Sequence, residues 1–227
     1  VSSPFAIWEM ARRGLDVSRC VSVGYLQTDA YDPVENPRTI LLAPTWNVSF
    51  TNFLLWIDDF VKQYGQYWAE RNVPIVFQAH PLASRSEIEM ASHWTGHCSN
   101  FELTAEGTDL VRLIGEAKVL VGDMGSALFL YLLTGRPIFA YNSFRWWEAG
   151  YGEGKCFDPQ DLSYTWRDMM YQFQDVSVLQ SMLVQYFDGS FDDVLAPLRQ
   201  FRKSMLFQQP IAGVLDRLAD DLVRRLV

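Results

Sequence analysis

The sequence has few cysteines and no long apolar run, and both shortages narrow the classes of protein that it can represent. Its 227 residues include only Cys20, Cys98 and Cys156, which lie far apart and show no CxxC spacing. This pattern argues against a disulfide framework or a zinc site and fits a reducing cytoplasm. No apolar run approaches the ~20 residues that cross a bilayer, and no secretory signal peptide is recognisable. We therefore expect a cytoplasmic protein, with peripheral association at the inner face of the cell membrane left open.

Basic residues are also in deficit. The chain carries 19 Lys and Arg against 27 Asp and Glu, a formal net charge of -8. Proteins that bind nucleic acid broadly derive most of their affinity from basic side chains on phosphates, so we expect no nucleic-acid partner. A local anion site made of backbone amides stays compatible with this composition, because such a site needs no net positive charge.

The composition is that of an ordered globular protein. Hydrophobic residues make up 49% of the chain and aromatic residues 15%, which is ample for a buried core, and charged residues make up 20%. The chain shows no block of like charges, no internal repeat and no low-complexity segment. Its first residue is Val rather than Met, so we expect it to begin inside a longer reading frame.

Short apolar runs alternate with helical patterns through most of the chain. Six runs are expected to form strands, at 19–25, 39–44, 73–79, 98–105, 118–123 and 136–141. Apolar residues at helical spacing predict helices at 53–67, 108–117 and 126–133. This alternation predicts an α/β fold, a Rossmann-like parallel sheet with helices on both faces.

The chain is expected to divide into three parts. Residues 1–18 end a preceding domain or link to it, and residues 19–159 form the Rossmann-like domain. Residues 160–227 form a helical tail that packs on the same domain, with no strand expected beyond about Gln160 and a last helix over 212–226. That last helix is amphipathic but mixed in charge, which favours docking onto protein over insertion into lipid.

Unusual chemistry follows three of the expected strands. Pro44 and Thr45 follow the first, His80 and Pro81 follow the second, and the sequence GDMGS at 122–126 ends the third. In open parallel sheets, ligands bind outside the carboxyl ends of the strands. The three tips are therefore expected on one edge of the sheet, where a donor site would lie after residues 43, 79 and 122.

The GDMGS turn allows two interpretations. Asp123 and Ser126 are common helix caps, and capping alone would account for them. In the alternative, Gly125 allows a close backbone approach and Ser126 opens a helix whose first N–H groups lack intrahelical partners, which makes an anion site. The turn is far shorter than a full GxGxxG fingerprint, so both interpretations stay open on these residues alone.

His80 lies before a proline, which disfavours a helix and places it in an extended tip or turn. There it can donate a hydrogen bond to a phosphate oxygen or exchange a proton near neutral pH, or simply bond to a neighbouring backbone group. His93 and His97 flank Trp94 in an expected polar loop, and because Gly96 interrupts it and a third ligand is missing, we expect no metal site there.

Further residues are weaker donor-binding candidates. Thr45 and Asn47 follow a strand and could present a hydroxyl and an amide, although both are also ordinary turn residues. Tyr151 and Gly152 belong to a glycine-rich loop that is expected either to cover the site or to act as a connector.

Several of these segments together resemble the C-terminal half of the CDP-glycerol glycerophosphotransferase family, the teichoic-acid and capsule polymerases with a GT-B fold. ILLAPTW, FQAHPL, IGEAKVLVGDMGSALFLYLLTGRPIFAYN and the Tyr151–Gly152 region follow in the family's order. They are similar to its "APT-aromatic" turn, "His-Pro" strand tip, "TDYSS" turn, "kPiify" strand and glycine-rich loop. VSVGYLQTD at 21–29 resembles the segment that joins the two halves in that family. The resemblance covers most of residues 20–157.

The resemblance implies transfer of a glycerol-phosphate or sugar unit from a nucleotide-linked donor to a polyol-phosphate or glycan acceptor of the cell envelope. Gly125, Ser126, Asp123 and Thr45 would bind the donor phosphates, and His80 would stabilise or protonate the leaving phosphate. The nucleotide-linked donor is a substrate, so no separate cofactor and no metal are expected. An N-terminal domain would complete the cleft, and we expect this chain alone to bind nucleotide without efficient turnover.

The sequence also departs from the family pattern. Gly122, Met124 and Gly125 replace its threonine, tyrosine and first serine, Asn47 replaces an arginine, and its "DGxAxxR" tail motif has no clear counterpart. Two alternatives follow. The chain could belong to a glycosyltransferase that uses a UDP-, GDP- or CMP-sugar, or it could be a nucleotide-binding domain that has lost catalysis. If the longer protein keeps its full activity after a His80→Ala change, His80 is structural and the catalytic interpretation fails.

Overall fold

The computed structural model describes most of the central part of the chain. The described residues are 4–20, 22, 28, 31–45, 53–123, 125–142, 166–207, 219 and 224. Four of the seven residues of the expected strand at 19–25 lie outside this part of the chain, and residues 19, 20 and 22 are not in a strand. The expected helix at 212–226 lies outside it except for residues 219 and 224.

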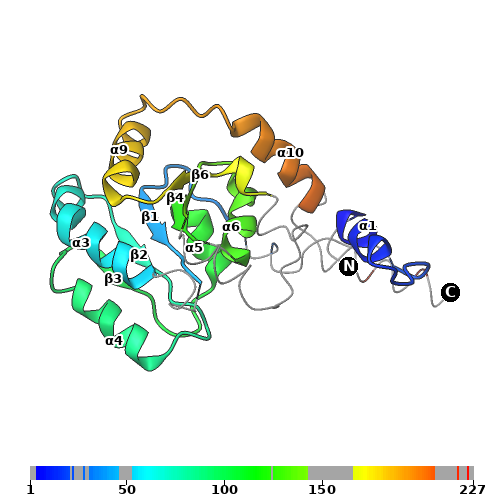
Figure 1. Ribbon diagram of the computed structural model, residues 1–227, viewed down its shortest axis with the longest axis horizontal. Coiled ribbons are helices and arrows are strands. Elements are labelled where there is room, and N and C mark those ends of the chain that lie inside the picture. The colour runs from blue at the N-terminus through cyan, green and yellow to red at the C-terminus, as the bar shows by residue number, and fades with distance from the viewer. Residues whose placement is uncertain are drawn as a thin grey trace.

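Six parallel strands form one sheet in the order β3-β2-β1-β4-β5-β6. The strands are β1 Thr39–Leu42, β2 Ile75–Phe77, β3 Phe101–Leu103, β4 Ala117–Gly122, β5 Ile138–Tyr141 and β6 Tyr171–Phe173. An all-parallel sheet is covered by helices on both faces, and Figure 1 shows helices on both sides of this one. The predicted Rossmann-like α/β fold is confirmed.

Helices connect the strands and form the outer layers. They are α1 Pro4–Arg12, α3 Phe53–Glu70, α4 Arg85–Trp94, α5 Leu110–Glu116, α6 Ser126–Leu130, η2 Tyr131–Thr134, η3 Arg167–Met169, α9 Val176–Phe187 and α10 Ala196–Leu206. One core joins the sheet to α3, α4 and α9, and a second joins its other face to α5, α6, η2 and α10. Helix α1 packs against α10, away from the sheet (Figure 1).

The two cores follow from alternation along the strands. Successive side chains of a strand point to opposite faces. In β1, Ile40 and Leu42 belong to the core under α3, whereas Leu41 belongs to the core under α5. In β4, Val119 and Val121 face the first core and Leu120 the second. This double burial explains why these strands are continuous apolar runs in the sequence.

Two expectations about secondary structure are wrong. A strand does occur beyond Gln160: β6 pairs in parallel with β5 at the edge of the sheet. Its three residues, Tyr-Gln-Phe, bury only the last fully, so the run lacks the apolar signature of a central strand. The expected polar loop after β2 instead contains α4, which Ser84 and Glu87 open with a capping box. That Ser-x-x-Glu spacing is a helix-start signal in the sequence.

The strand order fixes where a ligand can bind. Chain connections run outward from β1 through β2 to β3 on one side, and from β4 through β5 to β6 on the other. The order therefore reverses between β1 and β4. In open α/β sheets the crevice at the carboxyl ends of the two strands that flank this reversal is the usual ligand site.

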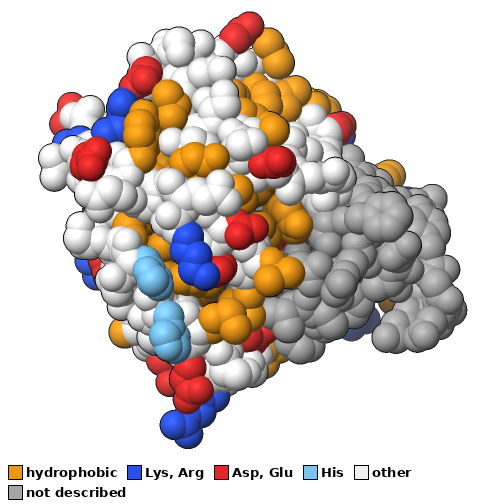
Figure 2. Space-filling model, turned by 60° about the vertical axis from the view of Figure 1, so that its left-hand side comes forward, with side chains coloured by type: hydrophobic (Ala, Val, Ile, Leu, Met, Phe, Trp, Pro, Cys, Tyr) orange, Lys and Arg blue, Asp and Glu red, His pale blue; other side chains and the backbone are white. Residues whose placement is uncertain are grey.

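Charged side chains of both signs lie on the surface of the described part. Figure 2 shows one face, on which acidic and basic side chains are scattered among apolar and polar ones rather than gathered into a basic stripe. Within the described residues, no helix is long and apolar enough to cross a membrane.

Candidate functional site

The tips of β1 and β4 are joined by one long-range hydrogen bond. The backbone N–H of Thr45 donates to Oδ1 of Asp123 over 2.8 Å. Asp123 follows the last residue of β4 and is only 2% exposed. The bond therefore ties together the two strands that flank the reversal in strand order, and two residues predicted for the donor site meet there.

Gly122 lets β4 approach β1 closely at this point. A Cβ at Gly122 would lie 2.9 Å from the carbonyl oxygen of Ala43 and 3.1 Å from Cδ2 of Leu128. Any side chain at 122 would force the Ala43 carbonyl to shift and the Leu128 side chain to give way. Close packing of the two strands therefore accounts for glycine at this position.

Gly125 gives the turn a backbone conformation that other residues avoid. Its φ is +102° and its ψ is −178°, a region that is populated almost only by glycine. It is the N-cap of α6 and makes no side-chain cap, while Ser126 is the first helical residue. Asp123 bonds to Thr45 rather than capping the helix. Of the two interpretations of this turn, the one in which Asp123 or Ser126 is the N-cap does not apply, because Gly125 occupies that position.

His80 lies beyond the end of β2, and its ring accepts a local hydrogen bond. The backbone N–H of Leu82 donates to Nδ1 of His80 over 3.1 Å. In the neutral ring, a proton-accepting Nδ1 places the hydrogen on Nε2. Partial burial lowers the pKa of His80, and the carboxylate of Glu87 opposes that shift. The lowered pKa favours the neutral ring, in which Nε2 carries the hydrogen.

The structure places His80 on the same edge as the Thr45–Asp123 link but not next to it. Strand β1 lies between β2 and β4. Two strand spacings of ~4.8 Å separate the axes of β2 and β4 by roughly 10 Å. A ligand that contacts both His80 and the 123–126 turn must span this distance, as a nucleoside diphosphate can.

The lowered pKa of His80 predicts a pH-dependent stability. The imidazole of His80 has a pKa near 6.5 in the unfolded chain and a lower pKa in the folded one. The unfolded chain therefore binds a proton more readily, and the folded state loses stability as the pH falls from about 6.5 through the folded pKa. We expect the stability of the unmodified chain to fall relative to a His80→Gln variant between neutral pH and about pH 5. Urea unfolding of both proteins measures this. A difference that stays constant with pH would contradict it.

Arg167 is a site residue that no motif in the sequence marks. It is 4% exposed, donates from Nη1 to the carbonyl of Asp123 over 2.5 Å and from Nη2 to the carbonyl of Tyr141 over 2.9 Å. It thus connects the tips of β4 and β5. Burial lowers its pKa to about 10, while the Asp123 carboxylate favours the charged form. The guanidinium therefore remains a buried cation at pH 7.

The remaining predicted residues divide into two groups. Asn47, Tyr151 and Gly152 lie outside the described residues. His93 belongs to α4, where its Nδ1 is 2.9 Å from the carbonyl oxygen of Glu89. Among the described residues, no three His, Cys, Asp or Glu side chains are grouped so that they could hold a metal ion.

The arrangement of strands is shared with known enzymes. Wall teichoic acid polymerase TagF superimposes on 99% of this chain and 56% of its own in one variant, with a TM-score of 0.63 and 14% identity. TagF soaked with CDPG matches over 98% of this chain and 55% of its own, with a TM-score of 0.58 and 14% identity. S. aureus MnaA with UDP matches over 100% and 58%, with a TM-score of 0.53 and 14% identity. The fold is GT-B-like.

These similarities lie in the fold rather than in the sequence. No model of a known protein family matches the chain, and no curated protein matches it significantly. The chain spans a little over half the length of the structures that it resembles, 55–58% of them. Identities of 14% show a common architecture and leave the chemistry to be argued from this chain's own residues.

Proposed function

We propose that this chain is the donor-binding half of a GT-B-type transferase that moves a glycerol-phosphate or sugar unit from a nucleotide-linked donor to a cell-envelope acceptor. The observation that carries the proposal is the Thr45–Asp123 hydrogen bond at the reversal in strand order. It holds the two strand tips together where nucleotides bind in folds of this kind.

Each site residue is given a role in this proposal. The diphosphate lies over the turn after β4, where Gly125 carries no side chain to block a close approach. Among the described residues, none has an atom within 4 Å of the position that a Cβ would take at Gly125. The backbone N–H and hydroxyl of Ser126 donate to phosphate oxygens, as does the Thr45 hydroxyl. His80 donates Nε2–H to the leaving phosphate and stabilises the charge that develops there. Buried Arg167 holds the carbonyls beneath the turn in place.

Asp123 is a poor ligand for the donor's phosphates, because its negatively charged carboxylate would repel them. We propose that it orients the backbone of Thr45 and is balanced by Arg167 instead. This assigns Asp123 to the site as a positioning residue rather than a phosphate ligand.

A second candidate is a glycosyltransferase donor domain for a nucleotide sugar. The fold likeness to MnaA, which was solved with UDP, favours it as much as the likeness to TagF soaked with CDPG favours a CDP-linked donor. The two candidate functions differ in the nucleotide that the donor carries. Measuring which nucleotide the chain binds therefore distinguishes them.

A nucleotide panel tests the proposal. We expect the 227-residue chain to be stabilised against thermal unfolding by one nucleoside diphosphate or its donor, by about 2.7 kcal/mol at a hundredfold excess over the dissociation constant. Selective stabilisation by CDP or CDP-glycerol favours glycerol-phosphate transfer. Stabilisation by UDP, GDP or CMP and their sugars favours glycosyl transfer. The absence of stabilisation by any of them would contradict the proposed donor site.

A further inference from the structure

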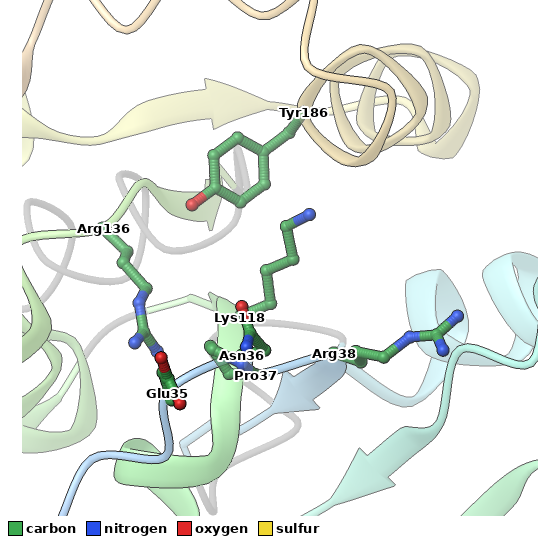
Figure 3. Close-up of a pocket in the computed structure, with 7 residues that line it drawn as sticks. All are labelled: Glu35, Asn36, Pro37, Arg38, Lys118, Arg136 and Tyr186. Carbon is green, nitrogen blue, oxygen red and sulfur yellow. The ribbon is translucent and has the colours of Figure 1, made fainter.

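A cavity lies at the edge of the sheet opposite the proposed donor site. We call it the basal cavity and define it by Glu35, Arg38, Lys118, Arg136 and Tyr186, which line it (Figure 3). Its volume is about 410 Å³ and it opens to solvent. This lies within the roughly 300–1,000 Å³ range of small-molecule sites.

The basal cavity is distinct from the donor site. Arg38 immediately precedes β1, Lys118 is the second residue of β4, and Arg136 lies two residues before β5. The cavity therefore lies at the amino ends of three neighbouring strands. Lys118 and Asp123 are five residue steps apart along β4 and the residue after it, which corresponds to roughly 16 Å.

Positive charge prevails in the basal cavity although the chain as a whole is acidic. Three of its lining residues are cations and one, Glu35, is an anion. Arg38 donates to the carbonyl of Arg71 over 3.3 Å, and Arg136 donates to the carbonyl of Ala117 over 2.5 Å. Both acceptors are neutral. Within the described part of the chain, no ion pair engages any of the three cations.

Lys118 is a partly buried cation whose side chain lies against two aromatic rings. It is half-buried, and its Nζ lies 4.5 Å from the ring centre of Phe187 and 5.4 Å from that of Tyr186. Burial, followed by repulsion from Arg38 and Arg136, lowers the pKa of Lys118, against an opposing pull from Asp188. That carboxylate forms an ion pair with Arg71. A partly desolvated cation among like charges gains most from an anion placed beside it.

We propose that the basal cavity binds a small phosphate-bearing anion, independently of the donor site. Arg136 can offer two parallel N–H donors to a phosphate and Lys118 a mobile point charge. The Tyr186 side chain extends into the same space, between the two cations in Figure 3, and its hydroxyl supplies a further donor. The size of the cavity fits a free phosphate compound. An extended polyanion would be repelled by the surrounding net charge of -8.

Pyrophosphate binding tests this site. We expect calorimetric titration at constant ionic strength to show binding to the unmodified chain, weakened about tenfold by Lys118→Gln and similarly by Arg136→Gln. Lys62→Gln is the matched control, because Lys62 is an exposed lysine of α3 paired with Asp58, and it should leave the affinity unchanged. Inorganic phosphate and glycerol phosphate are titrated in parallel, to show whether a single phosphate group suffices.

Two further variants keep the result interpretable. Glu35→Gln removes the one lining carboxylate from an exposed position, so it should tighten pyrophosphate binding without disturbing the fold. Gly125→Ala alters the donor turn and should leave this binding intact, which separates the basal cavity from the donor site. Equal affinities in the unmodified, Lys118→Gln and Glu35→Gln proteins would overturn the proposal, as would loss of pyrophosphate binding in Gly125→Ala alone.

Discussion

Replacing Arg167 with methionine is expected to lower the free energy of unfolding by about 3–5 kcal/mol, the largest effect of any single change at the site. Methionine keeps the length and apolar character of the side-chain stem. It removes the donors to the carbonyls of Asp123 and Tyr141 and leaves the buried Asp123 carboxylate without its facing cation. Urea unfolding measures the loss. A change below about 1 kcal/mol would contradict the assignment, because that is the value of an exposed ion pair.

Two companion variants identify the cause. Arg85→Met is the matched control, since Arg85 pairs with Glu89 on α4 with a side chain that is 92% exposed, and it should cost less than about 0.5 kcal/mol. The double variant Arg167→Met/Asp123→Asn should be more stable than Arg167→Met alone. Asparagine can still accept from the N–H of Thr45, but it no longer buries an uncompensated charge. If the double variant is no more stable, the cost arises from the lost carbonyl bonds alone.

Gly125→Ala is expected to destabilise the chain by about 1–3 kcal/mol and to abolish most nucleotide binding at the donor site. The added methyl group meets no atom within 4 Å, so crowding is not the cause. The cost comes from the backbone, because a φ of +102° with a ψ of −178° is strained for any residue with a Cβ. If the turn relaxes instead to avoid the strain, the backbone N–H of Ser126 changes direction and nucleotide binding is lost. Urea unfolding measures the strain, and nucleotide titration measures the loss of binding.

Gly189→Ala is the matched control for this prediction. Gly189 has a φ of +77°, and its Cβ position is also open to 4 Å, but it follows α9 rather than a strand tip. Alanine there should cost a comparable backbone strain of about 1–2 kcal/mol and leave nucleotide affinity unchanged. Normal affinity in both variants would contradict a phosphate position over Gly125.

Much of the fold can be predicted from local sequence because doubly buried strands are simple to recognise. The runs around Ile40, Ile75 and Val119 are apolar on both faces, and stripes of helical period separate them. Strand β6 escaped prediction because an edge strand of three residues buries too little to leave that pattern. Helix α4 differs from the prediction for another reason. Its capping signal at Ser84 and Glu87 lies in a polar segment whose composition is that of a loop.

The sequence by itself determined which residues lie at the strand tips, because the residue that follows a recognisable strand needs no tertiary information. That applies to Thr45, His80 and Asp123. Only the tertiary structure decided which tips are neighbours, since strand order depends on pairings between distant segments: Thr45 meets Asp123 across 78 residues, and His80 stands one strand further away. The tertiary structure alone also revealed Arg167 and the basal cavity. Arg167 bonds to backbone carbonyls, and the basal cavity brings together cations from separate segments. Neither arrangement leaves a pattern in a sequence.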